Sequence, residues 1–502
     1  MKPTHEFDVL KPENGDDLLD VFWELKTVLC KAAEQGQAAH EVELAVWKEV
    51  LKIGRQALGQ FFAMLGSGDM GAEIKLPDGQ SCQRLEEMHE RRYVSIFGEF
   101  TLRRTVYGSR EKQKIEFVPL DNRLQLPAGV FSYVLQDWDQ SFCVEQAFGP
   151  SAAAIARILG LRQSVDSLEA MNEDMAANVL DFWRERPVPK ASEEGEIMVT
   201  GADGKGIIMR RKEPAHVPAY RHKGEKASQK RIATVGTVYT VDRYVRTAED
   251  VVAALFRDGP KPETQSRPSP RHKHVWASLP WEEVEEFTGV DIVYTWLKEE
   301  VSQRNPKLSK EIVHLGDGQH SLWEARSTYL PAANCTDITD ILHVASYVWD
   351  AAHAFCPEGS DEAEQFARDR LLRILQGQAN RVVRGLREMA TKRGLAGAKK
   401  KTVAKVCAYL AANRERMHYD IYLAKGYPIA TGAIEGACRH LVKDRMERAG
   451  MHWTLRGAQS MLNARSVYIN GDWEIYQKFR IERETQRLYP YRAAVTDFHL
   501  AV

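Results

Sequence analysis

The chain has 502 residues, of which 44% are apolar and 28% charged, and at about 150 residues per domain it is long enough for two to four domains. No segment approaches the ~18 uninterrupted apolar residues that a membrane span requires, so the composition excludes a membrane protein, a collagen and a disordered chain. The opening residues show no secretory signal, and we expect a cytoplasmic protein.

The net charge of −1 conceals two strongly charged regions. Residues 1–50 carry 11 acidic and 5 basic side chains, whereas residues 366–420 carry 14 Lys or Arg against 4 Asp or Glu. Local fields of this size attract charged partners even when the whole chain is nearly neutral. The seven cysteines include no C-x-x-C pair, so the sequence predicts no zinc or redox centre.

Two elements are predicted before residue 120. Apolar residues at helical spacing from Asp16 to about Met64 predict a helical opening. Residues 92–118 have short β-branched and aromatic runs broken by Gly98 and Gly108, which predicts a small β-meander.

Residues 151–175 predict two helices joined by a turn at Gly160, with Ser164 capping the second helix. A helix-turn-helix would place its second helix in the major groove of DNA, and Arg157 and Arg162 are then candidate DNA contacts. An αα-hairpin with a glycine turn has the same pattern, so both interpretations stay open.

Strands are predicted at 196–210 and 231–245. The span from Lys205 to Arg231 contains nine Lys or Arg and two Glu, so it is either a solvated hairpin loop or a loop that grips phosphates. On the second interpretation the candidate DNA contacts are Arg210, Arg211, Lys212 and Lys223.

Further elements alternate up to residue 345. Helices are predicted at about 247–257 and 281–303, separated by a Pro-rich polar connector at 258–274, and a strand at 310–315 follows. Alternating short strands and helices point to a mixed α/β core, which a long helical stretch then interrupts.

Two Asp-Gly pairs, Asp203-Gly204 and Asp317-Gly318, each close a predicted strand. Either pair is compatible with an ordinary turn. Carboxylates at strand ends, however, are also where α/β proteins place their sites, and oxygen ligands suit Mg²⁺ or Mn²⁺.

The third candidate carboxylate is Glu435. Thr431 is a predicted N-cap, and Arg439 and Lys443 follow Glu435 at i+4 and i+8, so one helix face would carry a carboxylate and two cations. The alternative is an ordinary Glu-Arg pair on a surface helix.

Four segments in this order, GADGKG, HLGDGQHSLWEA, DILHVASYVWDAA and YPIATGAIEGACRHLVKDRMERAGMHW, carry a family resemblance. The chain from about Tyr93 to Asp472 resembles the Kra-type bacterial insertion-sequence transposases, a branch of the DDE transposases related to the Mutator group. The resemblance implies a ribonuclease-H-like catalytic core whose acidic triad, Asp203, Asp317 and Glu435, binds two Mg²⁺ or Mn²⁺ ions.

The resemblance also assigns Asp340 and His343 to a D-x-x-H feature that supports the triad. Arg439 is a further expected supporting residue. Otherwise Asp340 simply caps a helix and His343 is a core residue. Further DNA contacts are expected at Lys399, Lys400, Lys401 and Lys443. Trp453 is either a residue that stacks on a base or, like most of the aromatic residues, part of the core.

The expected organisation is an α/β ribonuclease-H-like core interrupted by an all-helical insertion, preceded by a helical and small-β DNA-binding region. The expected boundaries are 1–90 (helical), 91–190 (meander and helix-turn-helix), 195–355 with 426–455 (core), 356–425 (basic insertion) and 456–502 (tail).

The expected function is that of a transposase that binds the ends of its own insertion sequence, cleaves them and joins them to target DNA. Its partners would be double-stranded DNA and at least a second copy of itself, and it would lie in the cytoplasm at the nucleoid. A catalytically silent DNA-binding relative and a Mg²⁺-dependent nuclease of the same fold are the alternatives.

Overall fold

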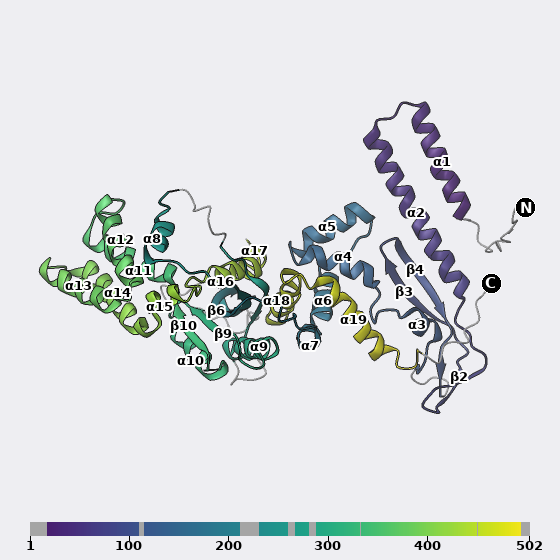
Figure 1. Ribbon diagram of the computed structural model, residues 1–502. Coiled ribbons are helices and arrows are strands. Elements are labelled where there is room, and N and C mark those ends of the chain that lie inside the picture. The colour runs from purple at the N-terminus through teal and green to yellow at the C-terminus, as the bar shows by residue number, and fades with distance from the viewer. Residues whose placement is uncertain are drawn as a thin grey trace, which may run out of the picture. The chain divides into compact units, whose positions relative to one another are not determined.

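The computed structural model describes residues 18–109, 115–210, 230–259, 267–280, 288–331, 333–448 and 450–492. The chain forms two compact units (Figure 1): unit 1 is Met1–Met171 with Glu474–Val502, and unit 2 is Asn172–Trp473. Within the described ranges no helix is both long and apolar enough to cross a membrane.

Unit 1 combines helices with two small antiparallel sheets. Its helices are α1 (Leu18–Glu34), α2 (Ala39–Leu65), α3 (Pro119–Leu124), α4 (Tyr133–Cys143), α5 (Phe148–Leu159), α6 (Val165–Ala176, which runs into unit 2) and most of α19 (Trp473–Leu488). Its strands are β1 (Glu73–Lys75), β2 (Ser81–Arg84), β3 (His89–Ser95), β4 (Gly98–Arg104) and β5 (Tyr107–Gly108). The helical opening is therefore confirmed, as a helix pair.

The predicted meander is wrong as a single sheet. Strands β3 and β4 form a hairpin with Ser95 opposite Gly98, whose φ of 128° suits only glycine. Strand β5 instead pairs with β2, where Gly108 lies opposite Gln83. The chain between β4 and β5 thus leaves one sheet for the other.

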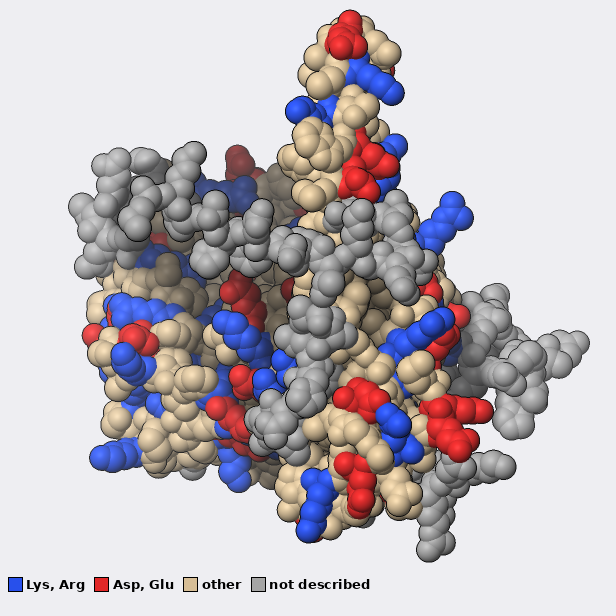
Figure 2. All heavy atoms as spheres, turned by 90° about the vertical axis from the view of Figure 1, so that its right-hand side faces the viewer, with Lys and Arg blue, Asp and Glu red and all other residues tan. Residues whose placement is uncertain are grey.

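Charged side chains of both signs lie on the surface of unit 1. On β3 and β4, Arg92 pairs with Glu99 and Arg103 with Glu90. Figure 2 shows Lys and Arg interspersed with Asp and Glu over the described surface in that view. This face of the described residues therefore presents no field of a single sign.

The two helices predicted at 151–175 are present as α5 and α6. Gly160, with φ of 72°, ends α5, and the Ser164 hydroxyl accepts a hydrogen bond of 3.1 Å from the Ser167 amide at the start of α6. Helix α5 begins at Phe148, three residues before the predicted start.

Unit 2 is built on one five-stranded mixed sheet with strand order β10-β9-β6-β7-β8. Its strands are β6 (Ile197–Ile208), β7 (Lys230–Val241), β8 (Arg271–Ser278), β9 (Glu311–Gly316) and β10 (Cys335–Thr339). Strand β7 runs antiparallel to both of its neighbours, β6 and β8, whereas β6, β9 and β10 run parallel. The mixed α/β core predicted from the sequence is therefore confirmed.

The predicted connector at 258–274 is partly wrong, because strand β8 begins at Arg271. The first residues of β8 are exposed and polar, and only its later residues, from His274 to Ser278, are buried. The strand therefore has no alternating or continuous apolar pattern in the part that follows the prolines.

The helices of unit 2 are α7 (Val179–Glu185), α8 (Ala248–Phe256), α9 (Gly289–Arg304), α10 (His320–Tyr329), α11 (Ile341–Phe355), α12 (Asp361–Leu375), α13 (Ala379–Lys392), α14 (Gly397–Asn413), α15 (Tyr419–Ala424), α16 (Gly432–Ala437), α17 (Asp444–Met446) and α18 (Leu455–Ile469). A short 3₁₀ segment, η2 (Arg414–Arg416), follows α14, and a π-helical segment, η3 (Cys438–Lys443), joins α16 to α17.

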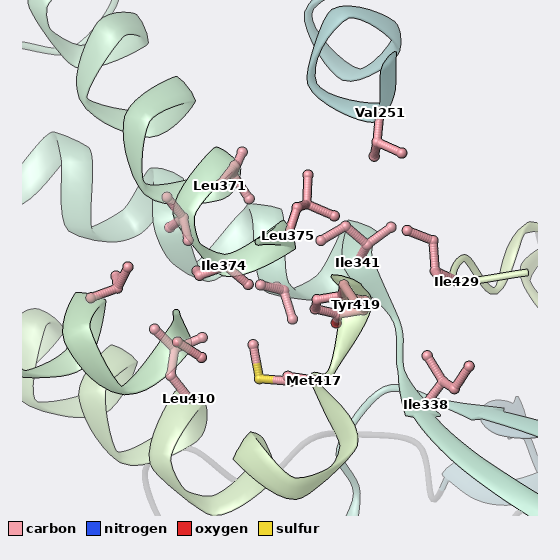
Figure 3. Packing of buried hydrophobic residues seen from close by; sticks show 14 of the residues in the cluster. Val251, Ile338, Ile341, Leu371, Ile374, Leu375, Leu410, Met417, Tyr419 and Ile429 are labelled. Carbon is pink, nitrogen blue, oxygen red and sulfur yellow. The ribbon is translucent and has the colours of Figure 1, made fainter. Parts of the chain in front are cut away.

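One apolar cluster joins the sheet to the helices from α11 to α15. Figure 3 shows Ile341 of α11 beside Leu375 of α12 and Tyr419 of α15, and Ile338 of β10 and Leu410 of α14 belong to the same cluster. Ile338, Leu375, Leu410 and Tyr419 are fully buried. Burial of such side chains contributes about 1.5–3 kcal/mol each, so the helical segment is fixed firmly to the sheet.

Candidate functional site

The register of the parallel strands aligns three aspartates at one edge of the sheet. The last pair between β6 and β9 is Gly201 opposite Leu315, and Asp203 and Asp317 each follow this pair by two residues. Gly316 of β9 lies opposite Thr339 of β10, which aligns Asp317 with Asp340 in the same way.

The prediction that Asp203 closes its strand is wrong. Strand β6 continues to Ile208, and Asp203 still pairs with Val235 of β7. Only the pairing with β9 ends at Gly201. Asp203 therefore lies where one neighbouring strand stops while the other continues, which leaves one side of its backbone without a strand partner.

Helix α16 packs on this end of the sheet through Ile434, which lies beside Gly201. A Cβ at Gly201 would lie 3.2 Å from the Leu315 carbonyl oxygen and 3.8 Å from Ile434 Cβ. Ile434 is buried at this contact, and the next residue, Glu435, is exposed. The packing of Ile434 over the sheet thus fixes the position of the Glu435 backbone near the aligned aspartates.

Asp340 is fully buried and fully hydrogen-bonded. Its carboxylate accepts bonds from the Thr431 amide (3.1 Å), the Thr431 hydroxyl (2.6 Å) and the Leu342 amide (3.0 Å), and lies 2.8 Å from His343 Nδ1. Burial alone would raise the pKa of Asp340, but the bonds from His343, Thr431 and Leu342 hold it below its usual range. The cap predicted at the start of α11 is confirmed by the bond to Leu342.

His343 is half-buried beside three carboxylates. The hydrogen bond to Asp340 raises the pKa of His343 above its ordinary value; burial opposes this, and the charges of Asp340, Asp317 and Glu435 add to it. Because Nδ1 bonds Asp340 and 40% of the side chain is exposed, Nε2 is the atom that remains for another partner. His343 is therefore not a core residue.

Among the described residues, Asp340, His343 and Glu435 form a group whose ligand atoms lie within 4.8 Å of one another. Neither Asp203 nor Asp317 belongs to this group. Carboxylate oxygens with one imidazole nitrogen form a donor set that suits Mn²⁺ or, with waters, Mg²⁺.

Thr431 links two of these residues in a way that the sequence does not reveal. It occupies the N-cap position of α16, but its side chain makes no capping bond, so the predicted cap is wrong. Its hydroxyl donates to Asp340 and lies 3.4 Å from Glu435 Oε1. The hydroxyl therefore bridges the buried and the exposed carboxylate.

Cys438 lies between Asp203 and Glu435. Its Sγ is 3.5 Å from Asp203 Oδ2, and burial, followed by the charges of Asp203 and Glu435, raises the pKa of the thiol. Cys438 is buried. Its position three residues after Glu435, on the same helical turn, is the signal that could have identified it.

Tyr409 connects the basic helical region to Asp317. Its hydroxyl donates to the Asp317 carbonyl oxygen at 2.8 Å, and a Cβ at Gly318 (φ 103°) would lie 2.8 Å from the Tyr409 ring. Gly318 therefore permits both the turn and the approach of α14. The Asp317 side chain itself accepts a bond of 2.9 Å from the Gln319 amide.

The expected face of Glu435, Arg439 and Lys443 is not present. The π-helical segment η3 begins at Cys438 and shifts the spacing of the residues that follow. Arg439 lies 3.7 Å from Asp444 instead, and Arg439 and Lys443 are both exposed.

The residues that we expected to contact DNA differ in how far their side chains are exposed. Arg157, Arg162, Arg210, Lys399, Lys400 and Lys401 are exposed, whereas Arg211, Lys212 and Lys223 lie outside the described residues. The stacking role of Trp453 is contradicted, because this residue is 7% exposed and its indole donates to the Met446 carbonyl oxygen at 3.2 Å. The backbone of Trp453 pairs with Met209 after β6, which holds the ring in the core.

No family model and no curated protein matches this chain. Among solved structures, the Drosophila P element transposase strand transfer complex is similar with 8% sequence identity and a TM-score of 0.24. The match covers 74% of this chain and 88% of that one. Similarity of this size is too low to establish a common fold.

Proposed function

We propose that this chain is a DDE-type DNA transposase that binds the ends of its own insertion sequence and performs strand cleavage and strand transfer. The observation that carries the proposal is that Asp203, Asp317 and Asp340 each follow the last paired residues of adjacent parallel strands, with Glu435 brought to Asp340 and His343 by α16. In such an arrangement Asp203, Asp317 and Glu435 would hold two Mg²⁺ or Mn²⁺ ions.

The strand directions support a ribonuclease-H-like core. Three antiparallel strands are followed by two that run parallel to the first. Asp317 and Asp340 directly follow the ends of β9 and β10, and Asp203 follows the last pair between β6 and β9. The helical segment from α12 to α15 separates β10 and α11 from α16, as an insertion would. Its Tyr409 contact would place the exposed lysines of α14 on the element that touches the Asp317 turn.

The bound ions would activate a water or a 3′-hydroxyl and stabilise the leaving 3′-oxygen at a DNA phosphate. The protein's own groups prepare this site. Asp340 orients the imidazole of His343 and, through Thr431, the start of α16. His343 Nε2 would then donate a hydrogen bond to a phosphate oxygen, and the raised pKa of His343 favours the protonated donor.

A cleavage assay tests the proposal. The purified chain is incubated with Mg²⁺ or Mn²⁺ and duplex DNA carrying the flanks of its own reading frame, beside Glu435→Gln and the matched control Glu324→Gln, whose carboxylate is exposed on α10. We expect metal-dependent cleavage by the wild type and the control, and none by Glu435→Gln. Binding without cleavage under either metal would favour a silent DNA-binding protein, and cleavage of any DNA without joining would favour a nuclease.

A further inference from the structure

A cavity of about 240 Å³ lies beside the last residues of β7. One wall is formed by Tyr239 and the chain that leads to α8, another by residues 267–270, and a third by residues 426–430. Asp203 pairs with Val235, four residues before Tyr239, so ~13 Å of strand separates the two positions. The cavity shares no residue with the candidate metal site.

Two guanidinium groups line this cavity, those of Arg246 and Arg267. Burial, and then the charge of Arg267, lowers the pKa of Arg246 below its usual range. Among the described residues neither arginine forms a salt bridge. Two cations that repel each other in one cavity leave a place for an anion.

Two carboxylates, those of Asp242 and Asp250, lie close enough to the cavity to matter, and each has a bonding partner of its own. Asp242, which also lines the cavity, lies 2.5 Å from the Arg271 guanidinium. Asp250 accepts the Thr247 amide at 2.8 Å in the capping box of α8, and its charge opposes the shift in the pKa of Arg246 only as the smallest contribution. Among the described residues, neither carboxylate therefore forms an ion pair with Arg246 or Arg267.

Two backbone carbonyl oxygens hold the Arg246 guanidinium in place and, among the described residues, leave some of its N–H groups unbonded. Its Nη2 donates to the Tyr427 carbonyl oxygen at 2.8 Å and its Nε to the Tyr244 carbonyl oxygen at 3.3 Å, and the guanidinium lies 5.2 Å from the centre of the Tyr244 ring. A guanidinium has five N–H donors, so three remain for a ligand. Such a fixed fork loses little freedom when it binds an oxyanion.

We propose that this cavity binds a phosphate group, with Arg246 and Arg267 as its cationic ligands. The phosphate is either free or part of a nucleic-acid backbone, and both sources present the same tetrahedral oxyanion to the guanidinium fork. This site is independent of the proposed function, because a phosphate site in this cavity requires neither metal nor strand cleavage.

The test has two arms with the full-length chain and three variants. Arg267→Ala removes one exposed cation, Arg267→Lys keeps the charge without the fork, and Lys298→Ala removes an exposed cation of α9 outside the cavity. In the first arm, calorimetry measures binding of inorganic phosphate; in the second, the salt dependence of duplex-DNA binding is measured.

If free phosphate is the ligand, it binds the wild type and Lys298→Ala equally, and Arg267→Ala weakens binding by at least tenfold, with Arg267→Lys in between. If the ligand is a backbone phosphate, inorganic phosphate does not bind, and Arg267→Ala lowers the salt slope for DNA by about 0.9 while Lys298→Ala leaves it unchanged. The proposal is overturned if Arg267→Ala and Lys298→Ala have the same phosphate affinity and the same salt slope for DNA binding.

Discussion

Two aspartates, one in each unit, are completely buried and yet are placed in opposite electrostatic environments. Asp340, after β10 in unit 2, receives bonds from two amides and a hydroxyl and contacts an imidazole, and its pKa is lowered. Asp139, on α4 in unit 1, has no hydrogen-bond partner among the described residues for either carboxylate oxygen, and burial raises its pKa to about 7.

The difference teaches that donors, rather than depth, decide whether a buried carboxyl stays charged. The Gln163 amide near Asp139 partly opposes the effect of burial but does not reach hydrogen-bond geometry. At Asp340 the donors come from a helix start, a neighbouring histidine and Thr431, which lies 91 residues away. The fold of unit 2 thus holds the Asp340 carboxylate charged and in a fixed position beside Glu435.

The largest effect is expected at Asp317, whose carboxylate is partly exposed, unlike the buried carboxylates of Asp340 and Asp139. If it is a metal ligand, Asp317→Asn keeps the size and removes the charge, and strand cleavage should fall by roughly a thousandfold or more. Asp203→Asn should act alike, and the double variant should add little, because the residues act as one unit. Cleavage assays with end DNA measure this, and wild-type rates in Asp317→Asn would remove this residue from the proposed site.

Asp340→Ala comes next, because it leaves the imidazole, two amides and the Thr431 hydroxyl without their shared acceptor. We expect it to lower the free energy of unfolding by about 3–5 kcal/mol, as for other buried charged networks that lose one partner. Asp340→Asn keeps the shape and should lose less. Urea denaturation measures both, and equal stability of Asp340→Ala and wild type would show that the network contributes nothing.

The helices and strands of unit 2 were easier to predict from the sequence than the contacts between them. The strand ending at Gly316 and the helix following Asp340 were predicted correctly, because each has a local apolar pattern and a local break. Strand β8 was missed because its exposed half follows prolines and carries polar side chains. An apolar sequence pattern therefore predicts a strand or helix only where one face of that element is buried along its whole length.

The partners of the site residues depend on distant parts of the chain. Thr431 has the sequence context of a helix cap, and only the folded chain brings it to Asp340. Trp453 has the context of an exposed basic segment, but the bridge to Met209 buries it. Such contacts between residues far apart in sequence leave no periodic signal, whereas Asp317 could be identified from its Asp-Gly turn.

A pH-dependent effect is expected for Asp139. Its pKa of about 7 in the folded chain exceeds the value of 3.8 for an unperturbed carboxyl, so the folded state retains the proton. Its contribution to stability is therefore favourable below about pH 4 and is lost as the pH rises to about 7. Asp139→Asn removes this loss, and its gain in the free energy of unfolding over wild type should be on the order of 3 kcal/mol larger at pH 8 than at pH 4.

Urea denaturation at the two pH values measures this difference. Gln163→Ala offers a matched comparison, because it removes the neighbouring amide and leaves the carboxyl to titrate. A gain for Asp139→Asn that does not change with pH would mean that Asp139 is charged in the folded chain, like Asp340.

The smallest effect is expected for Thr431→Val, which removes one hydroxyl and keeps the shape of the side chain. Loss of its bond to Asp340 should cost about 1–3 kcal/mol of unfolding free energy, and the conservative Thr431→Ser should restore most of it. Because the same hydroxyl lies near Glu435, cleavage should fall more in Thr431→Val than stability alone explains. Equal cleavage at equal folded fraction would restrict Thr431 to a structural role.

The most direct test of the central claim is to count metal ions on the folded protein. Electron paramagnetic resonance of a Mn²⁺ titration, without DNA, reports free and bound ions. We predict two bound ions for the wild type and for the surface control Glu324→Gln, and a loss of tight Mn²⁺ binding in Asp317→Asn and Glu435→Gln. Equal Mn²⁺ binding by all four proteins would contradict the assignment of these carboxylates to a metal site.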